Sequence, residues 1–159
     1  MSFLLQHAFV KNVSLAPLAL RVGAGIIFVA HGAQKLFGMF GGYGLEGTGQ
    51  WMASIGLEPG YLMALAAGSA EFFGGLLILV GLLTRPAAIV LAFTMLVAIV
   101  SVHLPNGLFM TNNGYEFGLS LLVLSISLAI SGAGKWSIDN AIVNYINDDS
   151  SEYQHTATA

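Results

Sequence analysis

Four side chains that could carry chemistry lie in a part of the sequence that should hold none. Arg21, His31 and Lys35 lie in or at the end of one apolar stretch, and Glu71 lies in the middle of the next. An ionised group in hydrocarbon costs at least about 2.5–3.5 kcal/mol even on lenient insertion scales, so each one needs a partner or a purpose. Arg21 could hold an anion, and Glu71 could relay protons. This inward-facing polar cluster is the first candidate for a functional site.

The composition indicates an integral membrane protein. The chain has 159 residues, of which 56% are hydrophobic and 8% are charged. A soluble domain carries about 25% charged residues, so this chain is expected to lie in a lipid bilayer. It contains no cysteine, which excludes a protein thiol, a disulfide and any cluster or metal held by cysteine. No basic patch indicates a nucleic-acid partner.

Four apolar stretches, at about 15–37, 61–83, 86–103 and 115–131, predict the membrane helices. The first two are long enough to span a core of about 30 Å, and the last two are near the minimum of about 17 residues. The predicted fold is all-α, an integral membrane four-helix bundle. The membrane domain is expected to cover residues 1–142. Residues 143–159 are expected to form an acidic, disordered cytoplasmic tail.

Small residues share one face with the charged residues in each of the first two helices. Steps of four and three residues align Arg21, Gly25, Phe28, Gly32 and Lys35 in the first helix, and Ala64, Gly68, Glu71, Gly75 and Ile78 in the second. Small residues let membrane helices approach closely, so both faces should look into the bundle. By depth, Glu71 could pair with either Arg21 or His31. Gln34 and Lys35 are by default expected to reach out to the membrane surface.

The connection between the first two helices predicts a short interfacial helix. Thr48 can cap a helix over residues 48–54 that carries Trp51 and Met52 on one side and ends at Gly56. Trp51 is expected to anchor this helix at the membrane surface. The alternative is that the helix forms a lid over the outer end of the bundle.

The distribution of basic residues predicts the orientation. An even number of helices places both ends of the chain on one side, together with Lys11, Arg85 and Lys135. The other side holds Lys35 beside acidic residues. Because cytoplasmic loops carry an excess of Lys and Arg, both termini are expected in the cytoplasm. No secretory signal peptide is predicted, since Met1–Val10 lacks a cationic start.

Several sequence motifs resemble those of one family. In order they are RVG at 21–23, FVAHGAQKLFG at 28–38, GLEGT at 44–48, GL at 56–57, AEFFGG at 70–75, HLPNG at 103–107, NGYEF at 113–117 and GAGKWSID at 132–139. These motifs are similar to those of the DoxX family, and the likeness covers about residues 15–142. The family consists of small four-helix proteins of the bacterial plasma (inner) membrane.

The resemblance also implies a functional hypothesis. Some DoxX-like proteins resemble the membrane subunit of thiosulfate:quinone oxidoreductase, and others associate with soluble enzymes of oxidative or thiol-stress defence. On this basis we expect a quinone-interacting redox subunit that takes electrons from a partner or from a small reductant such as thiosulfate. The expected catalytic residues are Arg21, His31 and Glu71, and the expected quinone-binding residues are Gln34, Lys35, His103 and Glu116.

Alternatives stay open from sequence alone. Arg21 and Glu71 could be a structural ion pair that locks the first two helices together. The protein could be a non-catalytic membrane anchor or assembly partner for soluble redox enzymes, or a small transporter that works as a homo-oligomer. No metal site is predicted, because His31, His103 and Glu116 lack the spacing typical of metal ligands.

Overall fold

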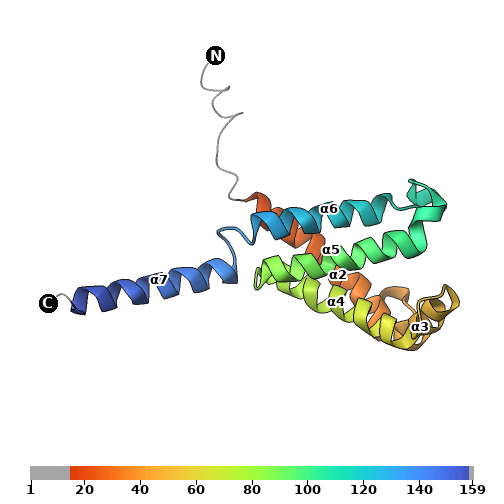
Figure 1. Cartoon of the computed structure of the whole chain (residues 1–159), viewed down its shortest axis with the longest axis horizontal. Helices are drawn as coiled ribbons and strands as arrows, with labels where there is room; N and C mark the ends of the chain where they lie inside the picture. The colour runs from red at the N-terminus through yellow and green to blue at the C-terminus, as the bar shows by residue number, and fades with distance from the viewer. Residues whose placement is uncertain (1–14, 158–159) are drawn as a thin grey trace, which may run out of the picture.

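The computed structural model describes the backbone of residues 15–157 and the side chains of residues 15–147. Within this part of the chain all regular structure is helical, which confirms the all-α prediction. Four helices form the bundle: α2 (Ala16–Phe37), α4 (Gly60–Val80), α5 (Thr84–Ala98) and α6 (Glu116–Ser131) (Figure 1). By length and composition, Ala16–Phe37, Gly60–Val80 and Thr84–Asn106 could each cross a membrane, and α6 is a shorter apolar helix. Lys11, which contributed to the predicted orientation, lies outside the described residues.

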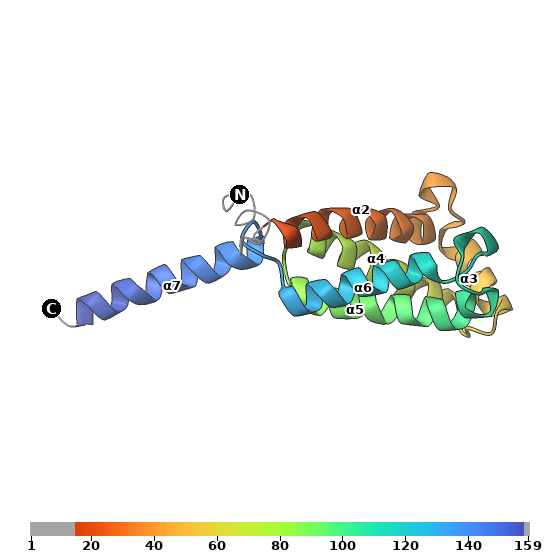
Figure 2. The same ribbon diagram turned by 90° about the horizontal axis from the view of Figure 1, so that it is seen from above.

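The bundle consists of two helix pairs that diverge toward one end. Helix α2 packs along α4, and α5 packs along α6. The two pairs meet where α4 turns into α5 and separate toward the opposite end, as Figure 1 shows, while Figure 2 shows the same helices from above. We call the first end, where α2 begins and α6 finishes, the terminal end. The opposite end, which contains the connections 38–59 and 99–115, is the loop end.

Glycines hold α2 and α4 at close range. A Cβ atom on Gly32 would lie 2.7 Å from the Phe72 Cα, and one on Gly75 would lie 2.8 Å from the Val29 backbone nitrogen. Gly25 faces Gly75 in the same interface. Close backbone approach stabilises membrane helices, whose apolar surfaces are otherwise equally well solvated by lipid. The structure therefore confirms that the two small-residue faces predicted from the sequence lie against each other.

The packed core fills the terminal half of the bundle. Its most buried large apolar side chains come one from each helix: Phe28, Ile78, Leu91 and Leu128. Toward the loop end this core stops at Phe28, Met95 and Leu121, which form the floor of a cavity. The two ends of the molecule thus differ in packing, and the candidate site lies above the core.

The short helices of the loop end differ from their predicted form. Helix α3 (Gly44–Ser54) begins four residues before the predicted position, so Thr48 is buried inside it and is not a cap. The physical reason is tertiary packing, because Gly49 of α3 lies against the backbone of Gly60 and Tyr61 at the start of α4. Two short 3-10 helices, η1 (Met39–Gly41) and η4 (Met110–Asn112), complete the connections.

The third predicted membrane helix ends in an unusual conformation. After Ala98 the chain continues as a π-helix, η2 (Ile99–His103), and then as a 3-10 helix, η3 (Leu104–Asn106). A π-helical turn widens the helix, and such turns are frequent at functional sites. In this protein the turn brings His103 to the cavity wall.

After the bundle the chain forms a helix, α7 (Ile138–Ala157), which extends away from the bundle (Figure 1) and covers most of the residues expected as a tail. Apolar residues recur at helical spacing in its first turns, at Ile138, Ile142 and Ile146. Asp139 lies in the first turn, where the helix dipole favours a negative charge. The acidic side chains at 148, 149 and 152 lie outside the described side chains.

Candidate functional site

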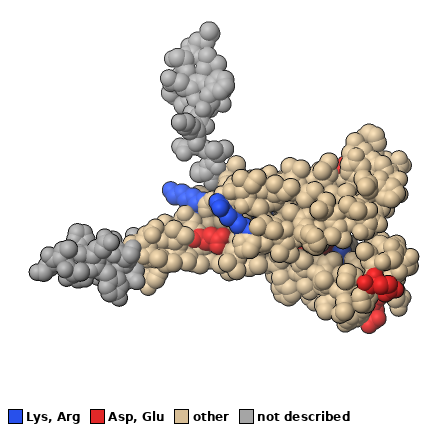
Figure 3. Space-filling view, viewed as in Figure 1, with Lys and Arg blue, Asp and Glu red and all other residues tan. Residues whose placement is uncertain are grey.

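An apolar cavity of about 700 Å³ occupies the loop end between the two helix pairs. All four bundle helices contribute to its walls, and α3 and the connection from α5 to α6 cover it. Its polar lining residues are His31, Lys35, Glu71, Thr94, His103 and Asn113. Cavities that bind small molecules have this size and character, with apolar walls and a few polar groups. In the space-filling view of Figure 3, a basic side chain is visible in the recess between the two halves of the loop end.

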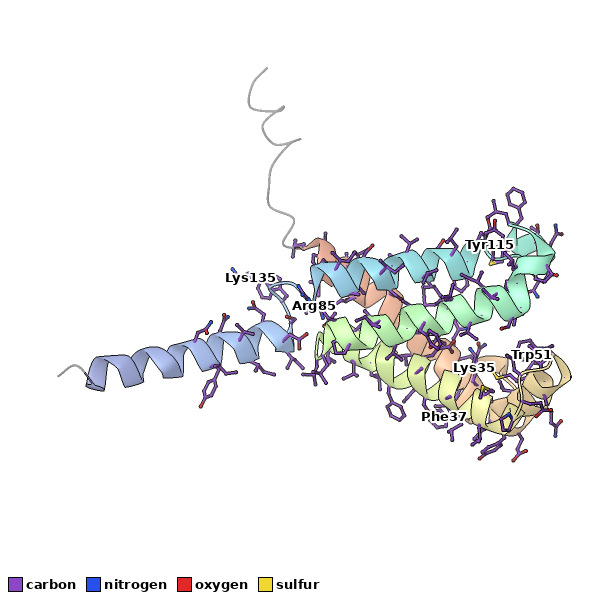
Figure 4. The ribbon with its side chains drawn as sticks, viewed as in Figure 1. Lys35, Phe37, Trp51, Arg85, Tyr115 and Lys135 are labelled. Carbon is purple, nitrogen blue, oxygen red and sulfur yellow. The ribbon has the colours of Figure 1, made fainter. Side chains whose placement is uncertain are left out.

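A partly buried ion pair lies in this cavity. The Nζ atom of Lys35 lies 2.5 Å from Oε2 of Glu71. Glu71 is 3% exposed, and the Lys35 side chain is 24% exposed. Figure 4 shows Lys35 pointing between the helices and not toward the end of the bundle. The expectations that Lys35 reaches the membrane surface, and that Glu71 pairs with Arg21 or His31, were wrong.

The sequence explains why Lys35 turns inward. Lys35 belongs to the small-residue face of α2, and Gly68 lies on α4 one turn before Glu71. A Cβ atom on Gly68 would lie 3.2 Å from the Lys35 Cβ, so the glycine allows the lysine stem to pass across α4. A buried carboxylate without a partner would be strongly destabilising, and the ammonium group supplies that partner.

Two histidines line the same cavity. The His31 ring packs against the Phe117 ring with centroids 5.8 Å apart, which joins α2 to α6. His103 Nδ1 lies 2.9 Å from the Asn113 carbonyl oxygen. Because a carbonyl only accepts, Nδ1 carries the proton, and in the neutral ring Nε2 is left as an acceptor. The structure thus brings together four of the predicted site residues: His31, Lys35, Glu71 and His103.

Arg21 lies at the terminal end, away from the cavity. The residue is 1% exposed, and Nη1 of its guanidinium group donates to the carbonyl oxygens of Ile78 and Leu79 at 3.3 and 3.2 Å. Nη2 donates to the carbonyl oxygen of Trp136. The last carbonyls of a helix have no partner within the helix, so Arg21 satisfies the end of α4 and complements its dipole. The hypothetical ion pair between Arg21 and Glu71 does not form.

Gln34 and Glu116 also lie outside the cavity lining. Gln34 Nε2 donates to the Phe40 carbonyl oxygen at 3.2 Å, and Glu116 Oε1 accepts from the Met110 backbone nitrogen at 2.6 Å. Both side chains therefore hold loop backbone in place. The structure gives them a positioning role at the loop end, in contrast to the quinone contact expected from the sequence.

Three lining residues were not assigned to the site from sequence. Thr94 and Asn113 line the cavity, and Trp51 of α3 lies over it. The Thr94 hydroxyl donates to the Val90 carbonyl oxygen within its own helix, so no unusual spacing marked this residue. Trp51 is 43% exposed, and its contact with the cavity favours the lid interpretation over a surface anchor alone. The sequence did contain a sign of the contact between Trp51 and the cavity. Trp51 and Met52 lie on the same side of the predicted short helix, and both line the cavity.

The fold and the site define a multi-pass helical membrane protein with an apolar cavity around a partly buried ion pair. The chain belongs to the DoxX family, whose model matches residues 16–104. That range contains all four titratable residues of the cavity, and it ends before Glu116.

Curated relatives extend over most of the chain. A Bacillus subtilis protein named "Putative oxidoreductase CatD" is 40% identical over 129 residues, 81% of this chain and 88% of its own length. The Escherichia coli inner membrane protein YqjF is 35% identical over 83% of this chain and 95% of its own length. The Escherichia coli inner membrane protein YphA is 32% identical over 77% of this chain and 86% of its own length. No solved structure matches the chain.

Proposed function

We propose that this protein is a quinone-interacting subunit of a redox system in the bacterial inner membrane, and that the quinone ring binds beside Lys35 and Glu71. The cavity is the observation that carries this proposal. Its volume of about 700 Å³ and its apolar walls suit a flat, apolar ring, and its few polar groups suit the ring's carbonyl oxygens. A quinone supplies two-electron chemistry that also takes up two protons.

The polar residues of the cavity match the needs of such a ring. The Lys35 ammonium group can donate a hydrogen bond to a carbonyl oxygen, and the Glu71 carboxyl group can hold a proton beside it. The N–H group of the His31 ring can donate in the same space. With no cysteine in the chain, no protein thiol delivers electrons. The proposal therefore includes a soluble electron donor, either a partner enzyme or a small reductant of the thiosulfate class.

The comparisons support the class and the location. The Bacillus subtilis relative carries an oxidoreductase name, and the two Escherichia coli relatives are named as inner membrane proteins. The exposed basic residues Arg85 and Lys135 lie at the terminal end, where Figure 4 labels them. Because cytoplasmic segments are enriched in Lys and Arg, we place the terminal end in the cytoplasm and the loop end on the outer side of the membrane.

The first test is the quinone content of the purified protein. The protein is purified in mild detergent, extracted with organic solvent and analysed by mass spectrometry, together with Glu71→Gln. Glu46→Gln is the matched control, because Glu46 is exposed on α3 and does not line the cavity. We expect stoichiometric quinone in the wild type and the control, and a loss of about tenfold or more in Glu71→Gln, since a charged hydrogen bond contributes about 1.5–3 kcal/mol. Wild-type protein without quinone, or equal quinone in Glu71→Gln, would refute the proposal.

A second candidate function rests on α7. This helix leaves the bundle with Ile142, Val143 and Ile146 exposed, a surface to which a soluble redox enzyme could bind. The protein would then act as a membrane anchor or assembly partner. Pull-down with the wild type and with Ile142→Ser tests this role. Loss of a partner from the variant, with its quinone content unchanged, would favour it.

The third hypothesis, an oligomeric transporter, has less support from the packing. A path through one chain would have to pass from the cavity to the terminal end. The side chains of Phe28, Ile78, Leu91 and Leu128 fill that half of the bundle.

A further inference from the structure

At the level of Glu71, the helices around the cavity differ in how closely each one contacts its neighbour. The four bundle helices meet along four seams, which are α2 with α4, α2 with α6, α5 with α6, and α4 with α5. A ligand that reaches the cavity from the side must pass through one of these seams. Which seam is open therefore decides where the ligand comes from.

Three of the seams are held by direct contacts. Gly32 of α2 lies against the Phe72 backbone of α4, so no side chain separates these two helices. The rings of His31 and Phe117 join α2 to α6. A Cβ atom on Gly118 of α6 would lie 3.0 Å from the side chain of Ile99, which closes the seam between α5 and α6.

The fourth seam, between α4 and α5, is closed only near the terminal end. There the Leu91 side chain lies 3.1 Å from a Cβ position on Gly74. Beyond this contact both helices line the cavity and are also partly exposed on the outside of the bundle. Helix α4 contributes the small side chains of Ala66, Ala67 and Ala70, and α5 contributes Phe93 and Val97, with Val90 at the level of the contact itself.

The exposure of the α5 residues shows that the seam faces outward. Val90, Phe93 and Val97 are 48%, 66% and 37% exposed, although each lines the cavity. Ala67 lies seven residues after the start of α4, about 10 Å along the helix. That depth lies within a hydrocarbon core of about 30 Å. In a bilayer spanned by α4, an opening at this depth would face lipid and not water.

We infer that the cavity takes its ligand from the bilayer through the seam between α4 and α5, and that the prenyl chain of a membrane quinone lies along this seam. This inference rests on the proposed function. Lys35 and Glu71 hold the polar end of the ligand, and the alanines of α4 leave room for the chain beside Phe93. The protein thereby selects quinones with long chains over free rings dissolved in water.

The test compares two ligands that share one ring. The probes are a prenylated naphthoquinone and the same ring with a methyl group in place of the chain, each added to protein in lipid nanodiscs. Binding is followed by quenching of Trp51 fluorescence in a Trp136→Phe background, because Trp51 lines the cavity. Ala67→Phe fills the seam. Val123→Phe adds a ring to the exposed face of α6 outside the cavity lining and is the matched control.

We expect Ala67→Phe to lower the affinity for the prenylated ligand by about tenfold or more, because each buried methylene group of the chain contributes to affinity. The methyl ligand should bind the variant as it binds the wild type, and Val123→Phe should bind both probes normally. Ala70→Phe provides the same test if Ala67→Phe does not fold.

Equal binding of the prenylated ligand by the wild type and by both seam variants would overturn the inference and leave the proposed function intact. An equal loss of affinity for both probes in the seam variants would also overturn it, because the prenyl chain would then have no binding site separate from that of the ring. Wild-type protein that binds neither probe would instead refute the quinone proposal itself.

Discussion

Both ends of the bundle bury a basic side chain of α2 against α4, but they use it differently. At the terminal end, Arg21 directs its hydrogen bonds to the backbone carbonyl groups of Ile78, Leu79 and Trp136. At the loop end, Lys35 meets the carboxylate of Glu71 at the edge of a cavity. A buried charge in a membrane protein therefore does not by itself mark a functional site. The two basic residues differ in their surroundings. The hydrogen bonds of Arg21 all go to backbone carbonyl groups, whereas Lys35 borders a cavity that a ligand can fill.

The surroundings of Arg21 support its structural role. Gly81, which ends α4 at a φ angle of +72°, leaves room for the guanidinium group where a side chain would collide with it. The Asp139 carboxylate accepts from the backbone nitrogens of Leu83 and Thr84 at 2.7 and 3.0 Å, so it caps the start of α5. Arg21 and Asp139 together tie the segment after α6 to the bundle. We call this arrangement the terminal clamp.

The largest expected effect comes from removing the charged part of the terminal clamp. Arg21→Leu removes the charged donor from three carbonyl groups, of which the Ile78 carbonyl keeps a backbone donor in Gly81, and we expect it to lower the free energy of unfolding by about 3–5 kcal/mol. Thermal unfolding in detergent measures the change. Arg85→Leu is the control, because Arg85 is exposed at the same end. If Arg21→Leu unfolded at the same temperature as the wild type and lost its quinone, Arg21 would belong to the site after all.

The next largest effect tests the close contact between α2 and α4. Gly32→Ala places a methyl group against the Phe72 backbone, which cannot move aside as a flexible side chain could. We expect a loss of about 3 kcal/mol, the upper end of the range for overpacking. Gly23→Ala is the matched control, since no atom lies within 4 Å of its added Cβ, and alanine favours a helix over glycine. Equal stability of the two variants would contradict the observed helix contact.

The sequence predicted this contact better than it predicted the site. Helical spacing placed Gly32 and Glu71 on inward faces, because the period of a helix is known in advance. The partner of Glu71 was not predictable in the same way, since depth along two helices depends on their tilt and offset. The cavity depends on side chains from α3, from the π-helical turn and from the connection after it. Their positions are set by tertiary contacts, such as Gly49 against Gly60, which no local pattern shows.

A double variant separates a structural lock from a ligand site at the loop end. Lys35→Met leaves the Glu71 carboxylate buried without a partner, and we expect it to cost about 2 kcal/mol because the lysine is partly exposed. Adding Glu71→Gln removes that unpaired charge. Because the two residues are in contact, their effects on stability are not additive, and the double variant should be within about 0.5 kcal/mol of the wild type in free energy of unfolding. Thermal unfolding and quinone extraction are measured on the same samples. A restored protein that still held its quinone would show that the ion pair is only a lock between α2 and α4.

The smallest expected effect concerns the acidic part of the terminal clamp. Asp139→Ala removes the cap of α5, and we expect a loss of about 1 kcal/mol, as for other capping residues. Asn144→Ala, on the exposed surface of α7, should change stability by less than about 0.5 kcal/mol. Because Asp139 lies at the end opposite the cavity, its loss should free the start of α7 while the quinone content stays unchanged. Faster backbone hydrogen exchange in residues 135–145, with the loop end as protected as before, is the expected pattern. Increased exchange around Lys35 and Glu71 would instead mean that the two ends are coupled, and the distinction between a clamp and a site would no longer hold.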